Sequence, residues 1–310
     1  MLTFDKLKIV STLSNIEIID EDKFQKVMAN GSVVLLKYYQ DNPFLLDIKI
    51  DYIEQELVIE FTGRVLGKEY SKLISIETIN RCFENINALG FCRINIEGMM
   101  DADVVKCDVS TDIHVEDVSR LTKYIRNHVG NYQRYMCRKM KNGNLTIEKN
   151  VTSKKYKKRI TIYDKGREMG LAGSKEYVEA NGLEGKFDGL CRFEVNLNTK
   201  EQIRQSLQIQ DTKLRSVLMS DAHPIRDFMD DIMKCSDEPR EMKDKKSYLT
   251  MLVLKDCSFD LEKVEAKMRS LHPKRGLNIR KIMEPYRAMM ESLGEENEPD
   301  MWREILDQLS

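Results

Sequence analysis

Three segments in the middle of the chain alternate strictly between apolar and polar residues, and this pattern constrains the fold more than any other feature. The alternation extends over residues 104–114, 159–165 and 191–198. Because successive side chains of a β-strand point to opposite faces of the sheet, it predicts strands with one apolar and one polar face. Antiparallel sheets commonly pack one such face on helices and leave the other to solvent. We therefore expect an α+β fold with an antiparallel sheet and helices on one face.

The polar positions of these three segments hold side chains that could bind a metal or take part in a reaction. They are Asp108, Asp112, His114, Tyr163, Lys165, Arg192 and Glu194, and Glu168 follows the second segment. Asp108 and Glu194 are expected to face each other. Carboxylates beside a histidine offer Mg²⁺ or Mn²⁺ the oxygen ligands and the imidazole that such ions accept. The alternative is a solvated sheet face on which ion pairs, such as Arg192 with Asp108, contribute little.

Helical periodicity follows and precedes these segments. Residues 76–89, 118–129 and 200–207 each place apolar side chains on one stripe and are predicted helices. We expect a first domain over 1–238 and, after a charged linker, a small, mainly helical C-terminal domain over 243–310. In that second domain the sequence predicts a short strand near 247–254, followed by helices.

Composition limits which partners, metal sites and cellular locations are expected. The 50 Lys and Arg residues nearly balance the 51 Asp and Glu residues, so the net charge neither requires nor excludes a polyanionic partner. The seven cysteines are scattered and include no C-x-x-C pair, which suggests neither a disulfide framework nor a zinc site. No apolar run approaches the roughly 20 residues of a membrane span. We expect a cytoplasmic protein that does not bind a membrane.

Positive charge is concentrated between residues 134 and 159, where ten Lys or Arg residues face a single acid, Glu148. Tyrosines are interleaved, and a "KNGN" turn lies in the middle. A hairpin of this composition could bind a phosphate backbone by charge and stack unpaired bases on its tyrosines, although a solvated lysine-rich hairpin is the alternative. The candidate DNA-binding residues are Arg134, Arg138, Lys139, Lys141, Lys154, Lys155, Lys157, Lys158 and Arg159.

Tyr163 allows two interpretations. A phenol has a pKa near 10, so its use as a nucleophile requires a cation that favours phenolate, which Lys165, Arg159 or a bound metal could supply. A tyrosine in a strand is more commonly a cross-strand packing residue. The residues alone leave both readings open.

The order of the motifs resembles a known family. "VVKCDVSTDI", a helix, "KRITIYDKGREM" and "LCRFEVNLNTKEQIR" follow one another as in the replication initiators of filamentous phages, the gene II/X type, and more distantly as in the Rep-trans plasmid initiators. The resemblance covers about residues 55–210. Lys106 and Cys107 differ from the Arg and Ile of the phage proteins, and the last seventy residues or so resemble no family.

This resemblance implies a site-specific nickase that starts rolling-circle replication on the polar face of the sheet. It implies that Tyr163 is the nucleophile that forms a 5′-phosphotyrosine, with Lys165 and Arg192 as catalytic cations. Mg²⁺ or Mn²⁺ is expected on Asp108, Glu168 and Glu194, with Asp112 and His114 as secondary candidates. The implied partner is single-stranded or hairpin origin DNA in a host bacterium, and a host helicase and polymerase are further candidates.

Two other functions are compatible with the same residues. A mobilisation relaxase would use this chemistry at a transfer origin, and a non-catalytic regulator would bind DNA on a sheet without a metal. The origin sequence, the physiological metal, the oligomeric state and the role of the C-terminal domain are not encoded in any motif found.

Overall fold

The computed structural model of the chain describes residues 2–129, 134–140, 142–153, 157–233, 244–257, 260–271, 278–294 and 305–309. The chain divides into two compact units. The first consists of residues 1–233 with 308–310, and the second of residues 234–307.

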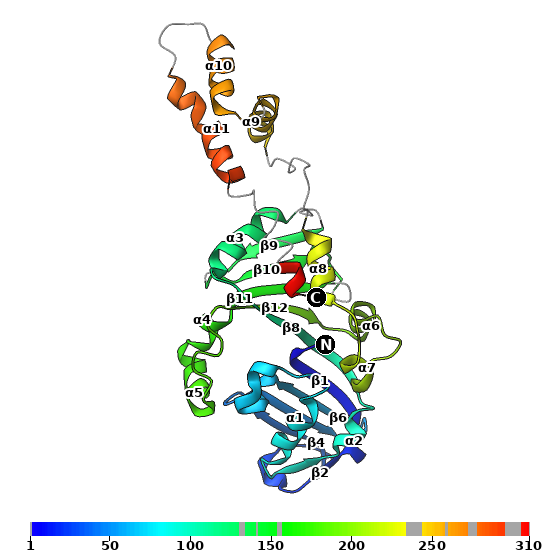
Figure 1. The fold of residues 1–310 in the computed structure, drawn as a ribbon. Helices are drawn as coiled ribbons and strands as arrows, with labels where there is room; N and C mark the ends of the chain where they lie inside the picture. Colours follow the sequence, from blue (N-terminus) through cyan, green and yellow to red (C-terminus); the bar gives the residue numbers. More distant parts are fainter. Residues whose placement is uncertain are drawn as a thin grey trace. The chain divides into compact units, whose positions relative to one another are not determined.

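The first unit is built on a ten-stranded antiparallel sheet, to which the earliest strand contributes a central position (Figure 1). In spatial order the strands are β3 (Gln25–Ala29), β4 (Ser32–Gln40), β5 (Leu46–Asp51), β6 (Glu56–Thr62), β1 (Phe4–Thr12), β8 (Asp103–His114), β12 (Leu190–Leu197), β11 (Arg159–Asp164), β10 (Leu145–Lys149) and β9 (Tyr135–Lys139). A separate pair joins β2 (Ile16–Ile18) to β7 (Cys92–Ile94). The three alternating segments of the sequence are β8, β12 and β11, which are neighbours.

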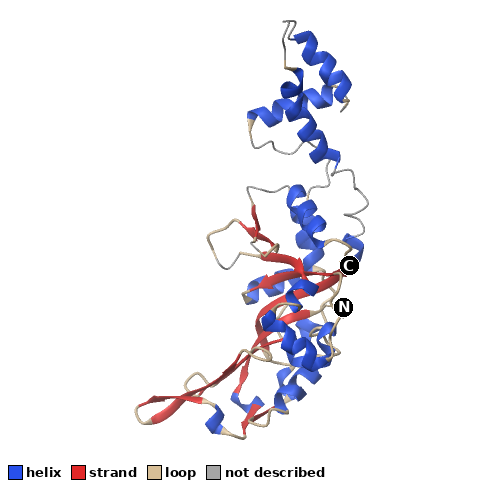
Figure 2. Cartoon of the chain, turned by 90° about the vertical axis from the view of Figure 1, so that its left-hand side faces the viewer, coloured by secondary structure: helices blue, strands red, loops and turns tan. Residues whose placement is uncertain are grey.

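Helices cover one face of this sheet, as the alternation predicts, and Figure 2 shows most helices of the unit along one side of the strands. The helices are α1 (Ile79–Asn87), α2 (Ile96–Met99), α3 (Val118–His128), α4 (Lys165–Met169), α5 (Ala172–Asn181), α6 (Lys200–Leu207), α7 (Leu214–Leu218) and α8 (Pro224–Ile232). Of these, α6, α7 and α8 pack on β8, and α3 packs on β11. The apolar positions Ile160, Phe193 and Val195 are buried beneath them. The predicted α+β fold is confirmed.

Two features outside this helical layer shape the polar face. A segment of 3-10 turns, Gly63–Lys72, follows β6 and is kinked at Gly67. Its Tyr70 packs with residues on and after α4 and α5, including Met169, Tyr177 and Phe187, into a small apolar cluster. On the other side, β9 and β10 form the predicted hairpin, and Gly143 adopts a φ of +87° in its turn.

The second unit contains α9 (Lys245–Asp256), α10 (Leu261–Leu271) and α11 (Ile279–Gly294), which enclose a core that includes Leu254, Val264 and Met283. The strand predicted near 247–254 is wrong, because this segment is α9. Asp244 caps its start by accepting from the backbone N–H groups of Lys246 and Ser247, each at 2.9 Å. Among the helices within the described ranges, none has both the length and the apolar character needed to cross a bilayer.

Candidate functional site on the polar face of the sheet

The pairing of β8, β12 and β11 arranges the polar positions in rows across the sheet. Tyr163 is opposite Arg192, and Arg192 is opposite Asp112. Glu194 lies two residues from Arg192 along β12, on the same face. Because directly opposed residues have Cα atoms about 4.5–5.5 Å apart, these four side chains share one small area of the polar face.

The sequence predicts that Asp108 and Glu194 face each other, but in the structure they are not directly opposed. Glu194 is paired with Ser110, whereas Asp108 is paired with Asn196, whose Nδ2 donates to Asp108 Oδ1 at 2.7 Å. Asp108 and Glu194 are therefore diagonal neighbours, at roughly 7–8 Å. Alternation identifies the face on which a residue lies but leaves the register between strands open.

Arg192 is the centre of the site and has no exposed surface. Its Nε and Nη2 donate to the two carboxylate oxygens of Asp112 at 2.6 and 2.7 Å, and its Nη1 donates to Asp5 Oδ1 at 2.6 Å. All three guanidinium nitrogens thus have carboxylate partners. In this arrangement Arg192 holds two acids in place rather than facing a scissile phosphate.

Asp5 is a site residue that sequence reasoning missed. In the pairing of β1 with β8, Phe4 is opposite Val109 and Lys6 is opposite Asp108, so Asp5 is the extra residue of a β-bulge. The bulge lets its carboxylate reach Arg192. Burial alone would raise the pKa of Asp5, but the charges of Arg192 and Lys165 hold it below its ordinary value.

Tyr70, in the Gly63–Lys72 segment, is a second site residue that was missed. Its hydroxyl donates to Asp5 Oδ1 at 2.9 Å and accepts from Lys165 Nζ at 2.8 Å and from Arg192 Nη1 at 3.2 Å. No local motif marks either Asp5 or Tyr70, because both reach the site through contacts between distant parts of the chain.

Lys165 differs from its prediction as a strand residue, since β11 ends at Asp164 and Lys165 opens α4. Asp164 caps this helix by accepting from the backbone N–H of Arg167 at 2.8 Å. The Lys165 side chain is only 2 % exposed, and its Nζ donates to Tyr70 Oη and, at 2.6 Å, to Glu168 Oε2.

Glu168 lies apart from the other proposed metal ligands. Its Oε2 accepts from Lys165, and its Oε1 accepts from Arg64 Nη2 at 3.0 Å. A carboxylate bound by two cations has its charge already compensated. Glu168 as it lies therefore serves to hold Lys165 and Arg64, and this chemistry does not fit a metal ligand.

Tyr163 is 8 % exposed, and its surroundings do not favour phenolate. Burial, and after it the charge of Glu194, raises the pKa of Tyr163 well above 10, and Arg192 opposes this only in part. Lys165 Nζ lies 5.7 Å from the centre of the phenol ring, and Arg159 Nε donates to Asn196 Oδ1 at 2.7 Å. The expectation that Lys165 and Arg159 lower the pKa of Tyr163 is therefore wrong for the protein without a bound metal.

The fit of a divalent cation depends on the remaining acids. Within the described residues, no three Asp, Glu, His or Cys side chains already have the geometry of a metal site. Burial, and after it the charge of Asp5, raises the pKa of Glu194 to about 8, and Asp108 adds to the shift. Burial also raises the pKa of Asp108. Repelling, partly buried carboxyl groups match the oxygen donors of Mg²⁺ or Mn²⁺, so Asp108 and Glu194 fit such an ion better than Glu168. Asp5, like Glu168, already has a cation partner, Arg192.

The secondary metal candidates, Asp112 and His114, do not lie with the proposed metal ligands Asp108 and Glu194. Asp112 is bound through both oxygens by Arg192. His114 is six residues from Asp108 along β8, or about 20 Å at the strand rise of ~3.3 Å, and it is exposed opposite Leu190.

The predicted DNA-binding residues lie on and around β9, β10 and β11. Arg134, Arg138, Lys139 and Arg159 are exposed, while Lys157 is partly buried and pairs with Glu148 at 3.1 Å. Lys158 is partly buried, and burial lowers its pKa. Lys141, Lys154 and Lys155 lie outside the described residues.

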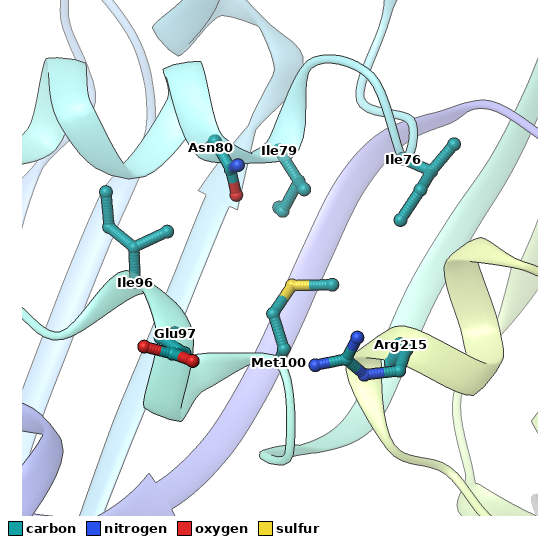
Figure 3. Close-up of a pocket in the computed structure, with 7 residues that line it drawn as sticks. All are labelled: Ile76, Ile79, Asn80, Ile96, Glu97, Met100 and Arg215. Atoms are coloured by element: carbon teal, nitrogen blue, oxygen red, sulfur yellow. The ribbon is translucent and has the colours of Figure 1, made fainter.

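Two cavities lie away from Tyr163. One, of about 360 Å³, is lined by Ile79, Met100 and Arg215 among others and lies between α1, α2 and α7 (Figure 3). A second, of about 520 Å³, includes Asp112 and His223 in its lining. Neither is lined by Tyr163, Asp108 or Glu194.

Comparison of the chain with protein-family models, with curated proteins and with solved structures found no match.

Proposed function

We propose that this protein nicks and rejoins one DNA strand at an origin, through attack by Tyr163 on a phosphodiester, and so starts rolling-circle replication of a phage or plasmid. The observation that supports this most is the row in which Tyr163 is opposite Arg192 and Arg192 is opposite Asp112, with Glu194 and Asp108 on the same face. A nucleophile, one buried cation and two acids with raised pKa values occupy three adjacent strands. The proposed setting is the cytoplasm of a host bacterium, where a host helicase and polymerase would act next.

In this reaction the Tyr163 oxygen forms a bond to phosphorus while the bond to the 3′ oxygen breaks. The phenol proton passes to solvent water. The products are a 5′-phosphotyrosine and, once the leaving oxygen has taken a proton from water, a free 3′-OH. Reverse attack by a 3′-OH rejoins a strand.

Mg²⁺ or Mn²⁺, held by Asp108 and Glu194, would supply positive charge that polarises the phosphate. Arg192 and Lys165 are buried, so they act on the site through their charges and hydrogen bonds. Their charges oppose the rise in the pKa of Glu194. Their hydrogen bonds fix Asp5 and Tyr70, so we assign them as positioning residues.

A non-catalytic DNA-binding regulator is the second candidate, and two observations favour it. Tyr163 is nearly buried with a raised pKa, and Glu168 is bound by Lys165 and Arg64. The relaxase alternative shares the chemistry of the first proposal and differs in the DNA site. Only the position of the preferred site, beside a replication origin or beside transfer genes, separates these two.

The experiment is a covalent-adduct assay. The purified chain is mixed with labelled single strands tiled across the DNA of the replicon that encodes it, with Mn²⁺ or with EDTA, and is run on a denaturing gel. We expect a protein–DNA adduct with Mn²⁺ that EDTA abolishes and that Tyr163→Phe lacks. The matched control is Tyr177→Phe, whose hydroxyl contacts the backbone of the Gly63–Lys72 segment and not the acids.

An adduct that persists in Tyr163→Phe would refute Tyr163 as the nucleophile. Specific binding by the wild-type protein without any adduct would favour the regulator.

A further inference from the structure

Three lysines on the polar face surround a single carboxylate. Lys6 and Lys8 on β1 and Lys106 on β8 have their Nζ atoms 2.6, 3.1 and 4.0 Å from an oxygen of Glu60 on β6. Glu60 and Asp108, which is opposite Lys6, supply two carboxylates for three ammonium groups, so this lysine cluster has excess positive charge.

The lysine cluster adjoins the candidate site. Lys6 is opposite Asp108, and Lys8 is opposite Lys106. The three side chains are 21, 29 and 33 % exposed, which leaves the stems packed on the sheet and the ammonium groups within reach of solvent. A ligand on the polar face near Asp108 would therefore meet these amines.

Holding Glu60 in place does not account for all three lysines. Like charges directly opposite on neighbouring strands are destabilising, and Lys8 and Lys106 are such a pair. Elsewhere in the sheet, Lys26 has two acids, Glu21 at 3.1 Å and Asp22 at 4.0 Å. The surplus at Lys6, Lys8 and Lys106 is the pattern expected where an anionic partner supplies the missing charge.

The register places this cluster and the basic hairpin on opposite sides of the acids. One row across the sheet runs from Lys6 through Asp108 and Asn196 to Arg159. At ~4.8 Å per strand, Lys6 and Arg159 lie about 14 Å apart. That distance corresponds to about four nucleotides at the ~3.4 Å spacing of a stacked strand.

We propose that Lys6, Lys8 and Lys106 bind the phosphate backbone of a single DNA strand that crosses the sheet, on the opposite side of the acids from the basic β9–β11 residues. The inference rests on the proposed function in placing DNA on this face. It adds a contact surface from the first strand of the chain, which lies outside the motifs and outside the basic segment.

The test measures the salt dependence of binding. Fluorescence anisotropy follows a labelled 30-nucleotide single strand of mixed sequence, in EDTA, between 50 and 300 mM salt. We expect the triple variant Lys6→Gln, Lys8→Gln, Lys106→Gln to bind more weakly, with the slope of log affinity against log salt reduced by about 2, or ~0.7 for each lost phosphate contact. Replacing the same three residues by arginine should keep the wild-type slope.

Lys26→Gln is the matched control, because it removes one charge from another strand of the same sheet where two acids balance it. Its slope should equal that of the wild type. An unchanged slope in the triple glutamine variant, an equal loss in the arginine variant, or a loss seen only with duplex DNA would each overturn the proposal.

The outcome separates this inference from the proposed function, because the binding assay requires no cleavage. With Tyr163→Phe as the parent protein, the glutamine variants should still lose slope. If the wild-type protein forms no adduct and the triple glutamine variant loses slope, the strand contact is supported and the nickase is rejected. A normal slope in a protein that does form adducts would reject the contact alone.

Discussion

Substitution of Arg192 by methionine tests the central ion network. The change keeps most of the side-chain volume but removes the guanidinium that binds Asp5 and Asp112. Breaking one partner of a buried ion pair costs about 3–5 kcal/mol, because it leaves charge buried without compensation. With a urea m-value of roughly 2–3 kcal/mol/M, the unfolding midpoint should fall by about 1–2 M.

The pH dependence of this loss follows from Asp5. In the wild type its pKa is below the ordinary 3.8, so the native state binds fewer protons than the unfolded state and this group adds stability as pH rises through that range. Without Arg192, burial dominates and raises the pKa of Asp5, so the native state then binds more protons. The stability deficit of Arg192→Met should therefore be smaller at pH 4 than at pH 7.

Urea titrations followed by far-UV circular dichroism at both pH values measure this. Arg204→Met is the matched control, since Arg204 also pairs with an acid at 2.6 Å but is 46 % exposed, and its loss should stay below about 1 kcal/mol. A deficit for Arg192→Met as small as that of the control, or one that does not change with pH, would refute the account of the network.

Two further variants test the acids. Glu194→Gln should be more stable than the wild type at pH 9 but not at pH 5 in metal-free buffer, because the folded pKa of about 8 exceeds the ordinary 4.5 and wild-type stability falls as pH rises between these values. Thermal melts check this, and an equal change at both pH values would contradict it. Glu168→Gln should leave Mn²⁺ affinity unchanged in calorimetry, whereas Glu194→Gln should lower it by at least roughly tenfold. Equal losses would restore Glu168 as a ligand.

Local pattern was sufficient to predict the strands of the site but not their register. The alternation in β8, β11 and β12 arises because one face is covered by helices and the other is not, so each residue could be assigned to a face from the sequence. Register depends on turns and contacts elsewhere in the chain. Asp108 was therefore placed on the correct face and opposite the wrong residue.

The residues that were missed, Asp5 and Tyr70, have no local pattern that could have revealed them. Asp5 reaches the site through a bulge, and Tyr70 through the contact of a 3-10 segment with Lys165 and Arg192. The error at α9 has a different cause. A short apolar run cannot be identified as strand or helix by periodicity, and the signal that could have decided it is the Asp244 cap with Ser247 three residues later.

The balance of charge on the polar face bears on the choice between a nickase and a regulator. Arg192 is compensated by Asp5 and Asp112, and Lys165 and Arg64 share Glu168. Asp108 and Glu194 form no such salt bridge. The nearby cations only partly oppose the rise in their pKa values, although the face between Lys6 and Arg159 is where DNA would lie. Uncompensated acids repel a phosphate backbone unless a proton or a cation neutralises them. A protein that only binds DNA gains nothing from them, whereas metal-assisted attack on a phosphate requires them. These acids therefore favour the nickase. The nickase also requires that Mg²⁺ strengthen binding of a single strand near pH 9, where Glu194 has lost its proton, and that Glu194→Gln remove most of that effect.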